Sequence, residues 1–313
     1  MKLLITGSSG YIGSILSNFF QKKGIAIVGV DIDNGRSPVT KNYKFYKCNI
    51  LNEKKLKYIF KKEKPTHVIH LAYILNPLHD IKKEDEIDLK GSRNVLRISN
   101  KTSSVKKFIQ FSSVSAYGAR KNNPLWIPED QILAPGSYRY ALNKKKIEND
   151  CNNFTRRNDL KIIILRVCIV FRPSCSKKKG AVTKILKSPF LIKKIKTTKF
   201  QLIHENDFNA LMDLIVKDET IEGTFNMSPD TFTSVVELFP KKYYLPIPIF
   251  LIKMVIDALW SLRIVNINSS GLEFCINDII VDPSKLIDRY EYKFQYTTLE
   301  GFKDSVSQWS DSH

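Results

Sequence analysis

The sequence predicts an α/β fold built on a doubly wound parallel sheet, and three observations carry that prediction. The chain opens with an apolar run, a glycine-rich turn, a helical pattern and a second apolar run, all within residues 2–31. Short apolar segments then alternate with helical patterns as far as residue 167. These segments have too few polar residues for one face to be exposed to solvent. This pattern is typical of parallel strands covered by helices on both sides.

The first unit has the pattern of a dinucleotide-binding βαβ motif. Gly7 allows a sharp turn after the first strand, Gly10 lets the backbone approach a pyrophosphate, and Gly13 lets the helix pack closely against the strand. Because the helix begins at this turn, its N-terminal N–H groups face the phosphates. The sequence therefore predicts a Rossmann sheet that binds a dinucleotide.

Asp31 closes the second apolar run and indicates which dinucleotide binds. It follows the glycines at roughly the 20-residue distance of an acidic residue that accepts hydrogen bonds from a ribose 2′-hydroxyl. The same carboxylate would repel a 2′-phosphate, which favours NAD over NADP. Arg36 lies nearby and could pair with a 2′-phosphate, so NADP remains the less favoured alternative.

The remaining elements follow in chain order. We expect strands near residues 44–48, 67–72, 108–111, 161–167, 200–203 and 224–226, and helices near residues 53–62, 84–99, 137–153 and 207–217. Residues 1–168 are expected to form the NAD-binding domain, with residues 202–228 returning to it. Residues 169–313 are expected to form mainly a smaller C-terminal substrate-binding region.

Composition restricts the class of protein. At 313 residues, 43% hydrophobic and 26% charged, the chain can bury a full core. Its five cysteines have no metal-ligand spacing, which favours free thiols in a reducing compartment and no metal site. The N-terminus has no targeting pattern, so we expect a cytoplasmic protein.

Residues 243–267 form the most apolar later segment. Prolines and charged residues interrupt it, so it lacks the continuous run of apolar residues that a membrane-spanning helix needs. Lys253, Asp257 and Ser261 recur in it every four residues, which predicts a helix buried except for that polar stripe. Attachment to a membrane surface is the alternative.

The formal charge of +19 raises nucleic acid as a partner, although abundant, dispersed lysine makes that a less favoured interpretation. Between Arg172 and Lys199 the chain has ten basic residues and no acidic one. We interpret this basic stretch as a solvated face, with recruitment of an anionic substrate as the alternative.

Three side chains form a candidate chemical centre. Tyr140 and Lys144 begin a predicted helix four residues apart, so they share one face. A phenol that ionises near pH ~10 is a poor base at neutral pH, and an adjacent ammonium favours its phenolate. Ser113 follows the strand at 108–111, at the edge where ligands bind parallel sheets, and can hydrogen-bond a reacting oxygen.

Several further motifs occur in a fixed order along the chain. They are Thr6–Gly13, His70–Ala72, Gly91–Leu96, Ser112–Gly118, Tyr140–Lys144 with Glu148, Leu165–Arg166, His204–Asp207 and Asp282–Leu286. In this order the chain resembles an extended short-chain dehydrogenase/reductase, of the NAD-dependent epimerase/dehydratase family that includes UDP-glucose 4-epimerase-like enzymes. The resemblance covers nearly the whole chain.

The resemblance implies roles for individual residues. Ser113, Tyr140 and Lys144 would form the catalytic triad. The cofactor would be held by Gly7, Gly10, Tyr11, Ile12, Gly13, Asp31, Asn49, Ile50, Leu71, Ala72, Tyr140 and Lys144. The family also implies a nucleotide-sugar substrate and a homodimer formed through the helices near residues 84–99 and 137–153.

The chain departs from the family pattern at several positions. Asn49 stands where the family usually has Asp, and Asp88 replaces a usual Asn. Ile169 replaces an Asn that commonly contacts the nucleotide-sugar phosphate, which weakens the argument for that substrate class. Val114 and Ser115 occupy the positions of the Asp-Glu pair of the family's dehydratases. Dehydration is disfavoured because elimination of water needs a second acid and base.

The sequence therefore predicts an NAD-dependent oxidoreductase, either an epimerase (an isomerase) or a dehydrogenase/reductase, that acts on a secondary hydroxyl of a nucleotide sugar. The alternatives are a nucleotide-dependent RNA- or polyanion-binding protein and a redox-sensing protein on the same fold. His204, Glu205 and Asp207 resemble a metal cluster, but we expect Asn206 or Asp207 to be a helix N-cap instead.

Overall fold

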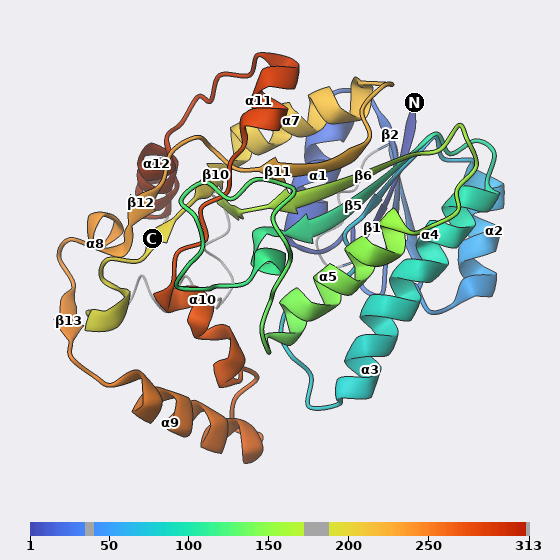
Figure 1. The fold of residues 1–313 in the computed structure, drawn as a ribbon. Helices are drawn as coiled ribbons and strands as arrows, with labels where there is room; N and C mark the ends of the chain where they lie inside the picture. Colours follow the sequence, from blue (N-terminus) through green and yellow to red (C-terminus); the bar gives the residue numbers. More distant parts are fainter. Residues whose placement is uncertain (35–40, 172–187, 311–313) are drawn as a thin grey trace. The chain divides into compact units, whose positions relative to one another are not determined.

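The computed structural model describes residues 1–34, 41–171 and 188–310 (Figure 1). Within these ranges, seven strands form the main sheet, in the order β11-β6-β5-β4-β1-β2-β3. They are β1 (Lys2–Thr6), β2 (Ala26–Asp31), β3 (Tyr43–Lys47), β4 (His67–His70), β5 (Lys107–Ser113), β6 (Lys161–Val167) and β11 (Gly223–Met227). The pairs β1–β2, β2–β3, β1–β4 and β4–β5 are parallel, so the predicted doubly wound sheet is confirmed.

The direction of winding changes between β1 and β4. From β1 the chain adds β2 and β3 on one side, and then crosses to add β4, β5 and β6 on the other. Thr6, the last residue of β1, is in register with His70, the last residue of β4. In sheets of this kind ligands bind beyond the carboxyl ends of the strands at such a switch point.

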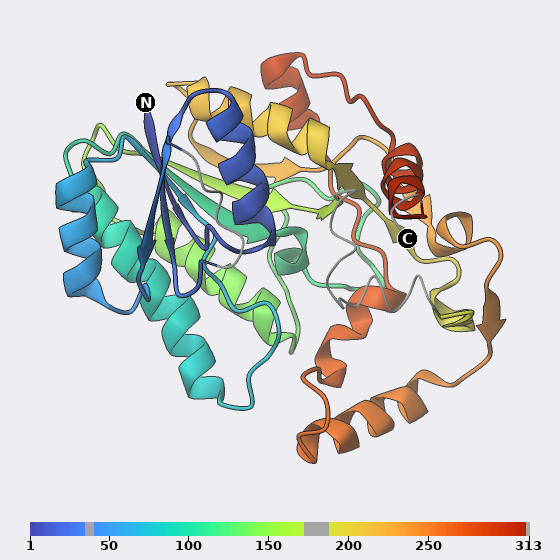
Figure 2. The same ribbon diagram turned by 180° about the vertical axis from the view of Figure 1, so that it is seen from behind.

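Helices cover both faces of the sheet (Figures 1 and 2). The helices are α1 (Tyr11–Lys22), α2 (Glu53–Glu63), α4 (Ser92–Lys101), α5 (Arg139–Asn152) and α7 (Glu205–Lys217). Apolar side chains of α2, α4 and α5 pack on one face of the strands, where Leu4, Val68 and Phe108 are fully buried. On the other face, an ion pair of 2.6 Å between Lys23 and Asp213 joins the end of α1 to α7.

The single helix expected at residues 84–99 has three parts. It consists of α3 (Ile81–Asp85), a π-helical turn (Glu86–Gly91) and α4. The turn is stabilised by a hydrogen bond from Ser92 Oγ to the carbonyl of Asp88. At Gly91 a Cβ would lie 2.5 Å from Ile50 Cδ1, so a larger residue would require the Ile50 side chain to move. Such turns occur often at functional sites.

The chain divides into two compact units, which we describe separately. The first consists of residues 1–113, 142–166 and 209–225, and the second of residues 114–141, 167–208 and 226–313. Of the segment 202–228, β11 joins the main sheet, while β10 (Leu202–His204) pairs with β7 (Ile169–Phe171). The expected domain division at residue 168 stays a prediction.

The second unit contains small sheets and short helices. Its further elements are β8 (Phe190–Ile192), β9 (Lys199–Phe200), β12 (Thr233–Ser234), β13 (Tyr243–Leu245), α8 (Val235–Leu238), α9 (Ile249–Ser261), α10 (Glu273–Ile276), α11 (Ser284–Tyr290) and α12 (Thr298–Ser310). Asn226 is fully buried in this unit. Its side chain accepts a hydrogen bond of 2.7 Å from Tyr117 and donates to the carbonyls of Ile127 and Asp282. This amide therefore joins three separate segments.

The prediction that Asn206 or Asp207 is the N-cap of the helix near residues 207–217 is wrong. Helix α7 begins at Glu205, so Asp207 lies inside it and is not the N-cap; its carboxylate instead accepts hydrogen bonds from Tyr292 and from the backbone N–H of Gln295. His204 takes the capping role, because its Nδ1 accepts from the N–H of Asn206. Its Nε2 then carries the proton and donates to Asp304.

The prediction that residues 243–267 pack in the core is also wrong. Helix α9 forms in this segment, but none of its described residues is fully buried, and Phe250, Met254 and Val255 are exposed. Of the predicted polar stripe, Asp257 and Ser261 are exposed and Lys253 is partly exposed, yet the spacing could not reveal that the apolar side is exposed as well. None of the described helices has the length and apolar character needed to span a bilayer.

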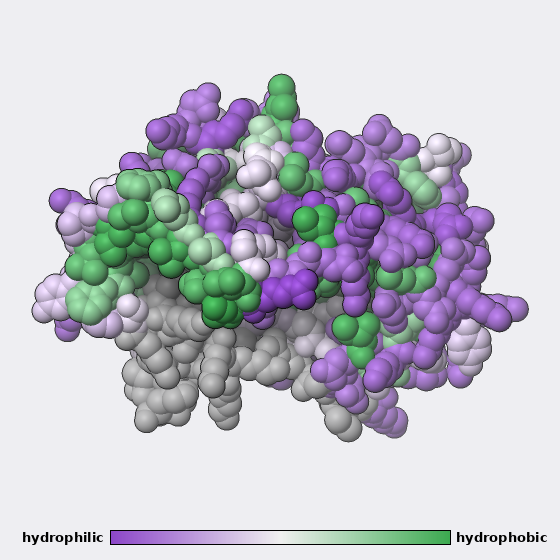
Figure 3. Space-filling model, turned by 90° about the horizontal axis from the view of Figure 1, so that it is seen from below, coloured by the Kyte–Doolittle hydropathy of each residue, from purple (hydrophilic) through white to green (hydrophobic). Residues whose placement is uncertain are grey.

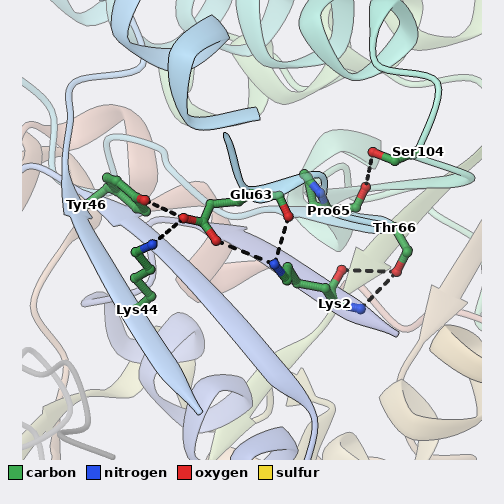
Figure 4. Close-up of polar contacts among 7 residues, drawn as sticks. All are labelled: Lys2, Lys44, Tyr46, Glu63, Pro65, Thr66 and Ser104. Atoms are coloured by element: carbon green, nitrogen blue, oxygen red, sulfur yellow. Dashed lines mark hydrogen bonds and ion pairs between the residues drawn. The ribbon is translucent and has the colours of Figure 1, made fainter. Parts of the chain in front are cut away.

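A polar cluster joins the end of α2 to β1 and β3 (Figure 4). Glu63, at the end of α2, accepts hydrogen bonds from Lys44 at 2.6 Å and from Tyr46. Lys2 donates to the backbone carbonyl of Glu63 at 2.8 Å, and its own backbone exchanges two hydrogen bonds with Thr66. Burial alone would raise the pKa of Glu63, but the hydrogen bonds from Lys44 and Tyr46 outweigh it and hold that pKa below its usual range.

We expect Glu63→Gln to lower the free energy of unfolding at pH 7 by about 1–3 kcal/mol, because Lys44 and Tyr46 lose a charged acceptor. A carboxyl with a lowered pKa contributes stability at higher pH and loses it as the pH falls through the folded-state pKa. The difference should therefore shrink below about pH 4.5, the ordinary value for this group. Urea unfolding at several pH values measures it.

The matched control is Glu86→Gln, which removes an exposed pair with Lys90. Its effect should stay within about 0.5 kcal/mol. Equal effects of the two substitutions would show that the Glu63 cluster is no more important for stability than a surface pair.

Candidate functional site

The glycine turn between β1 and α1 has no room for side chains at two positions. Gly7 adopts φ +70°, and a Cβ there would lie 2.7 Å from the backbone nitrogen of Ala72. At Gly13 a Cβ would lie 2.1 Å from the carbonyl oxygen of Gly7. Gly10 is less confined, with its nearest contact at 3.1 Å, and it is exposed at the start of α1.

Asp31 lies beside this turn at the end of β2. Its carboxylate accepts a hydrogen bond of 2.9 Å from the backbone N–H of Ser9 and one of 2.7 Å from that of Ile32. Each carboxylate oxygen can accept more than one hydrogen bond, so these contacts orient the group and leave acceptor capacity for a ligand hydroxyl. Arg36, which the sequence proposes as the NADP-type partner, lies outside the described residues.

His70 joins the end of β1 to the start of α4. Its Nδ1 lies 2.6 Å from Thr6 Oγ1 and its Nε2 lies 2.8 Å from Ser92 Oγ. Because Ser92 donates its own proton to the carbonyl of Asp88, His70 must donate from Nε2 and accept at Nδ1. Burial, together with the charge of Lys144, lowers the pKa of His70 to about 3. The ring is therefore neutral and structural.

Lys144 is the central charged group of the first unit. It projects from α5, is 4% exposed, and donates a hydrogen bond of 2.8 Å to the carbonyl of Phe111 in β5. Its Nζ lies 3.7 Å from the centre of the Tyr73 ring. Burial lowers the pKa of Lys144 to about 8, against the attraction of Asp88 and Glu148, which raises it. Near neutral pH the group is still largely an ammonium.

Asp88 lies in the π-helical turn and is fully buried. One oxygen accepts from the N–H of Ile74 at 2.9 Å, and the other accepts from Asn143 at 3.4 Å. Burial raises the pKa of Asp88 to about 6, because these hydrogen bonds and the charge of Lys144 offset the cost only in part. Asp88, which stands where the resemblance leads us to expect Asn, is therefore hydrogen-bonded and interacts electrostatically with Lys144.

A buried network fixes the next turn of α5. Glu148 accepts hydrogen bonds from the guanidinium of Arg166, at 2.7 Å and 3.0 Å, and from Ser112 Oγ. The side chains of Arg166 and Glu148 are 6% and 1% exposed. In the sequence, Ser112, Glu148 and Arg166 are recognisable only as parts of motifs that resemble the family. The available signal was the spacing of Tyr140, Lys144 and Glu148 at every fourth residue, which puts all three on one helix face.

The other candidate residues are placed as follows. Ser113 is the last residue of β5 and is partly exposed, two residues beyond the carbonyl that binds Lys144. Tyr140 is partly exposed and lies one turn before Lys144 on α5, with its ring 5.8 Å from that of Tyr138. Tyr11, Ile12, Leu71 and Ala72 are partly exposed, Asn49 is exposed, and Ile50 is buried.

A family model described as "NAD dependent epimerase/dehydratase family" matches residues 3–228. The chain belongs to this family. The resemblance inferred from the sequence motifs is therefore confirmed, and the match covers both the glycine turn and α5.

Relatives within the NAD-dependent epimerase/dehydratase family have different reactions in their names. A dTDP-D-glucose 4,6-dehydratase of Dictyostelium discoideum is 29% identical over 77% of this chain and 61% of its own length. A UDP-glucuronate 4-epimerase of Thermodesulfobacterium geofontis is 30% identical over 55% of this chain and 56% of its own length. The chain thus spans only 56–61% of the lengths of these two relatives.

Solved structures share the fold over the whole chain. The Bordetella bronchiseptica enzyme WbmG, in complex with NAD and UDP, matches with a TM-score of 0.79 and 21% identity, covering 99% of this chain and 95% of that one. A UDP-glucose 4-epimerase of Thermotoga maritima with UDP-glucose matches with a TM-score of 0.78 and 22% identity, covering 100% and 99%. At this identity the likeness establishes the fold.

We expect Arg166→Met to lower the free energy of unfolding by about 3–5 kcal/mol, because it leaves the carboxylate of Glu148 buried without its cation. The double variant Glu148→Gln/Arg166→Met should lose less than the sum of the two single variants, since neither charge then remains unpaired. Urea unfolding of the four proteins measures this coupling. Strictly additive losses would mean that the two side chains do not act as a pair.

Proposed function

We propose that this chain binds NAD at the glycine turn and acts on a secondary hydroxyl of a nucleotide sugar, as an epimerase or a dehydrogenase/reductase. The observation that carries the proposal is the buried ammonium of Lys144, attached to the end of β5 and one turn from Tyr140 on the same helix face. A charge this deeply buried favours an adjacent phenolate.

The glycine turn fits a dinucleotide pyrophosphate. Side chains at Gly7 and Gly13 would collide with the backbone, and the exposed Gly10 leaves the start of α1 open to phosphate oxygens. Asp31 would accept from the adenosine ribose, which supports NAD over NADP, and Leu71 and Ala72 would line the middle of the cofactor. Tyr11 and Ile12 would present the first N–H groups of the helix, while Asn49 and Ile50 would lie near the adenine.

When bound, NAD supplies a nicotinamide that accepts a hydride from the substrate carbon and can return it. The protein supplies the proton transfer. In this proposal the phenolate oxygen of Tyr140 removes the hydroxyl proton from the substrate, and Lys144 stabilises the phenolate. The hydroxyl of Ser113 donates a hydrogen bond to the reacting oxygen and limits the build-up of charge on it.

Two side chains favour epimerisation or simple oxidation over dehydration. Val114 and Ser115 follow Ser113 in a short 3-10 helix, at the positions where the dehydratases of the family have an acid pair. Neither valine nor serine can serve as the second acid and base that elimination of water requires. This supports the reaction named for the UDP-glucuronate 4-epimerase relative over that of the dehydratase relative.

The remaining proposals rest on the family and on composition. The UDP and UDP-glucose of the related structures support a nucleoside-diphosphate sugar as substrate. Ile169, exposed in β7, replaces the phosphate-contacting Asn of the family, so we propose that the diphosphate is bound mainly by other residues. We also propose a homodimer through the helical segments near residues 84–99 and 137–153, a cytoplasmic location, and the NAD-binding and substrate-binding regions divided near residue 168.

The experiment compares Tyr140→Phe with Tyr138→Phe, a tyrosine whose ring lies beside that of Tyr140. Turnover is followed by NMR with NAD and a panel of UDP- and dTDP-sugars, and NAD binding by calorimetry. Tyr140→Phe should reduce kcat by about 10²–10⁴-fold, because the base is lost, and should keep its affinity for NAD. Tyr138→Phe should remain within a few-fold of the original protein.

Wild-type turnover by Tyr140→Phe would contradict the assignment of the base. A wild-type protein that binds NAD and yet converts no sugar nucleotide would contradict the enzymatic proposal and favour the redox-sensing alternative. Failure to bind NAD would contradict the cofactor site itself.

A further inference from the structure

Helix α9 exposes a wide apolar face in the second unit. Phe250, Met254 and Val255 are 62%, 64% and 58% exposed, and they recur at the spacing of one helix face. The face continues beyond the helix, where Leu262 and Ile264 are exposed by 69% and 66%. Figure 3, which views the molecule from below the orientation of Figure 1, shows a green hydrophobic patch on this face.

The opposite side of α9 packs against its own unit. Ile252, Ile256 and Leu259 are partly buried, and the helix lies against the short turn at residues 269–271. Asp257 accepts hydrogen bonds of 3.1 Å and 2.7 Å from the N–H and hydroxyl of Ser269, which fix this orientation. The helix is therefore held with its apolar side toward solvent, which is an uncommon arrangement for an isolated soluble chain.

The surroundings of the patch are strongly basic. Residues 188–204 and 241–268, which contain the β8–β13 sheet and α9, have eight lysines and arginines and one acidic residue, Asp257. On the neighbouring α10, Glu273 pairs with Lys253 at 3.6 Å, so that lysine is partly neutralised. The basic residues are Lys193, Lys194, Lys196, Lys199, Lys241, Lys242, Lys253 and Arg263. Of these, Lys193, Lys194, Lys196, Lys241 and Arg263 are exposed. The basic residues 172–187 lie outside the described residues.

We propose that α9 and the exposed apolar residues that follow it attach this protein to an anionic lipid surface. A helix of 13 residues cannot cross a bilayer, but it can lie in the interface with its apolar face among the acyl chains. The exposed aromatic rings of Phe190 and Tyr243, paired across β8 and β13, have the amphipathic or apolar character suited to the headgroup region.

Charge selects lipid over a second copy of the chain. A symmetric dimer through this face would bring the same lysines of two copies together, and like charges at an interface are costly. An anionic membrane instead offers the opposite charge to the lysines and an apolar layer to α9. The basic residues would then contact the anionic headgroups, and the apolar face of α9 would contact the acyl chains.

The test is sedimentation of the full chain with sucrose-loaded vesicles, either pure phosphatidylcholine or phosphatidylcholine with about 30% phosphatidylglycerol. Met254→Glu should weaken binding to the anionic vesicles at least tenfold, because it puts a charge in the apolar face. Lys193→Glu/Lys194→Glu should weaken binding at least tenfold, since each lysine near an anionic surface contributes severalfold in affinity.

The matched control is Lys54→Glu/Lys61→Glu, which makes the same charge change on exposed positions of α2 and should alter binding by less than threefold. Equal loss in the control would contradict attachment through α9 and indicate a general effect of net charge. No binding by the wild type, or equal binding to both vesicle types, would overturn the proposal. It would also be overturned if Met254→Glu converted a dimer to a monomer without affecting vesicle binding. Unchanged melting temperatures show that the variants are folded.

Discussion

A buried ammonium is the constraint on which the proposed site depends. Burying the charge of Lys144 costs free energy unless the surrounding groups compensate it. The partners come from separate segments: the carbonyl of Phe111 in β5, the ring of Tyr73 after β4, and the carboxylates of Asp88 and Glu148. Because the carbonyl of Phe111 and the ring of Tyr73 both contact the nitrogen of Lys144, they help to fix the position of α5 on the sheet. The π-helical turn holds Asp88 in the interior, where its charge raises the pKa of Lys144.

The central sheet could be predicted because its signals are local. An apolar run, a turn and a helical period lie within about 30 residues of one another, and parallel pairing follows from their alternation. The position of α9 could not be predicted in this way. Its hydrophobic period indicates a helix, but whether the apolar side meets the core depends on what else in the unit packs there. His204 as the cap of α7 was missed because Asn and Asp are more usual at that position.

The site was predictable to the same extent and for the same reason. Gly7, Gly13 and Asp31 follow from spacing within one motif, and the structure brings them to one turn. The network of Ser112, Glu148 and Arg166 joins residues from three elements, and pattern within any one of them does not reveal the contact. Its function in this account is mechanical, because it fixes the turn of α5 that follows Lys144. The charge of Glu148 is tolerated in the interior because Arg166 pairs with it.

The most direct test of the central claim is to titrate Lys144 itself. In protein labelled with ¹³C at lysine Cε, the Lys144 signal can be assigned by its absence from Lys144→Met and followed by NMR as the pH is raised. We expect a midpoint at about pH 8, because burial lowers the pKa of Lys144 more than Asp88 and Glu148 raise it. A midpoint near 10.5, the ordinary value for a lysine, would show an exposed ammonium and contradict the proposed site.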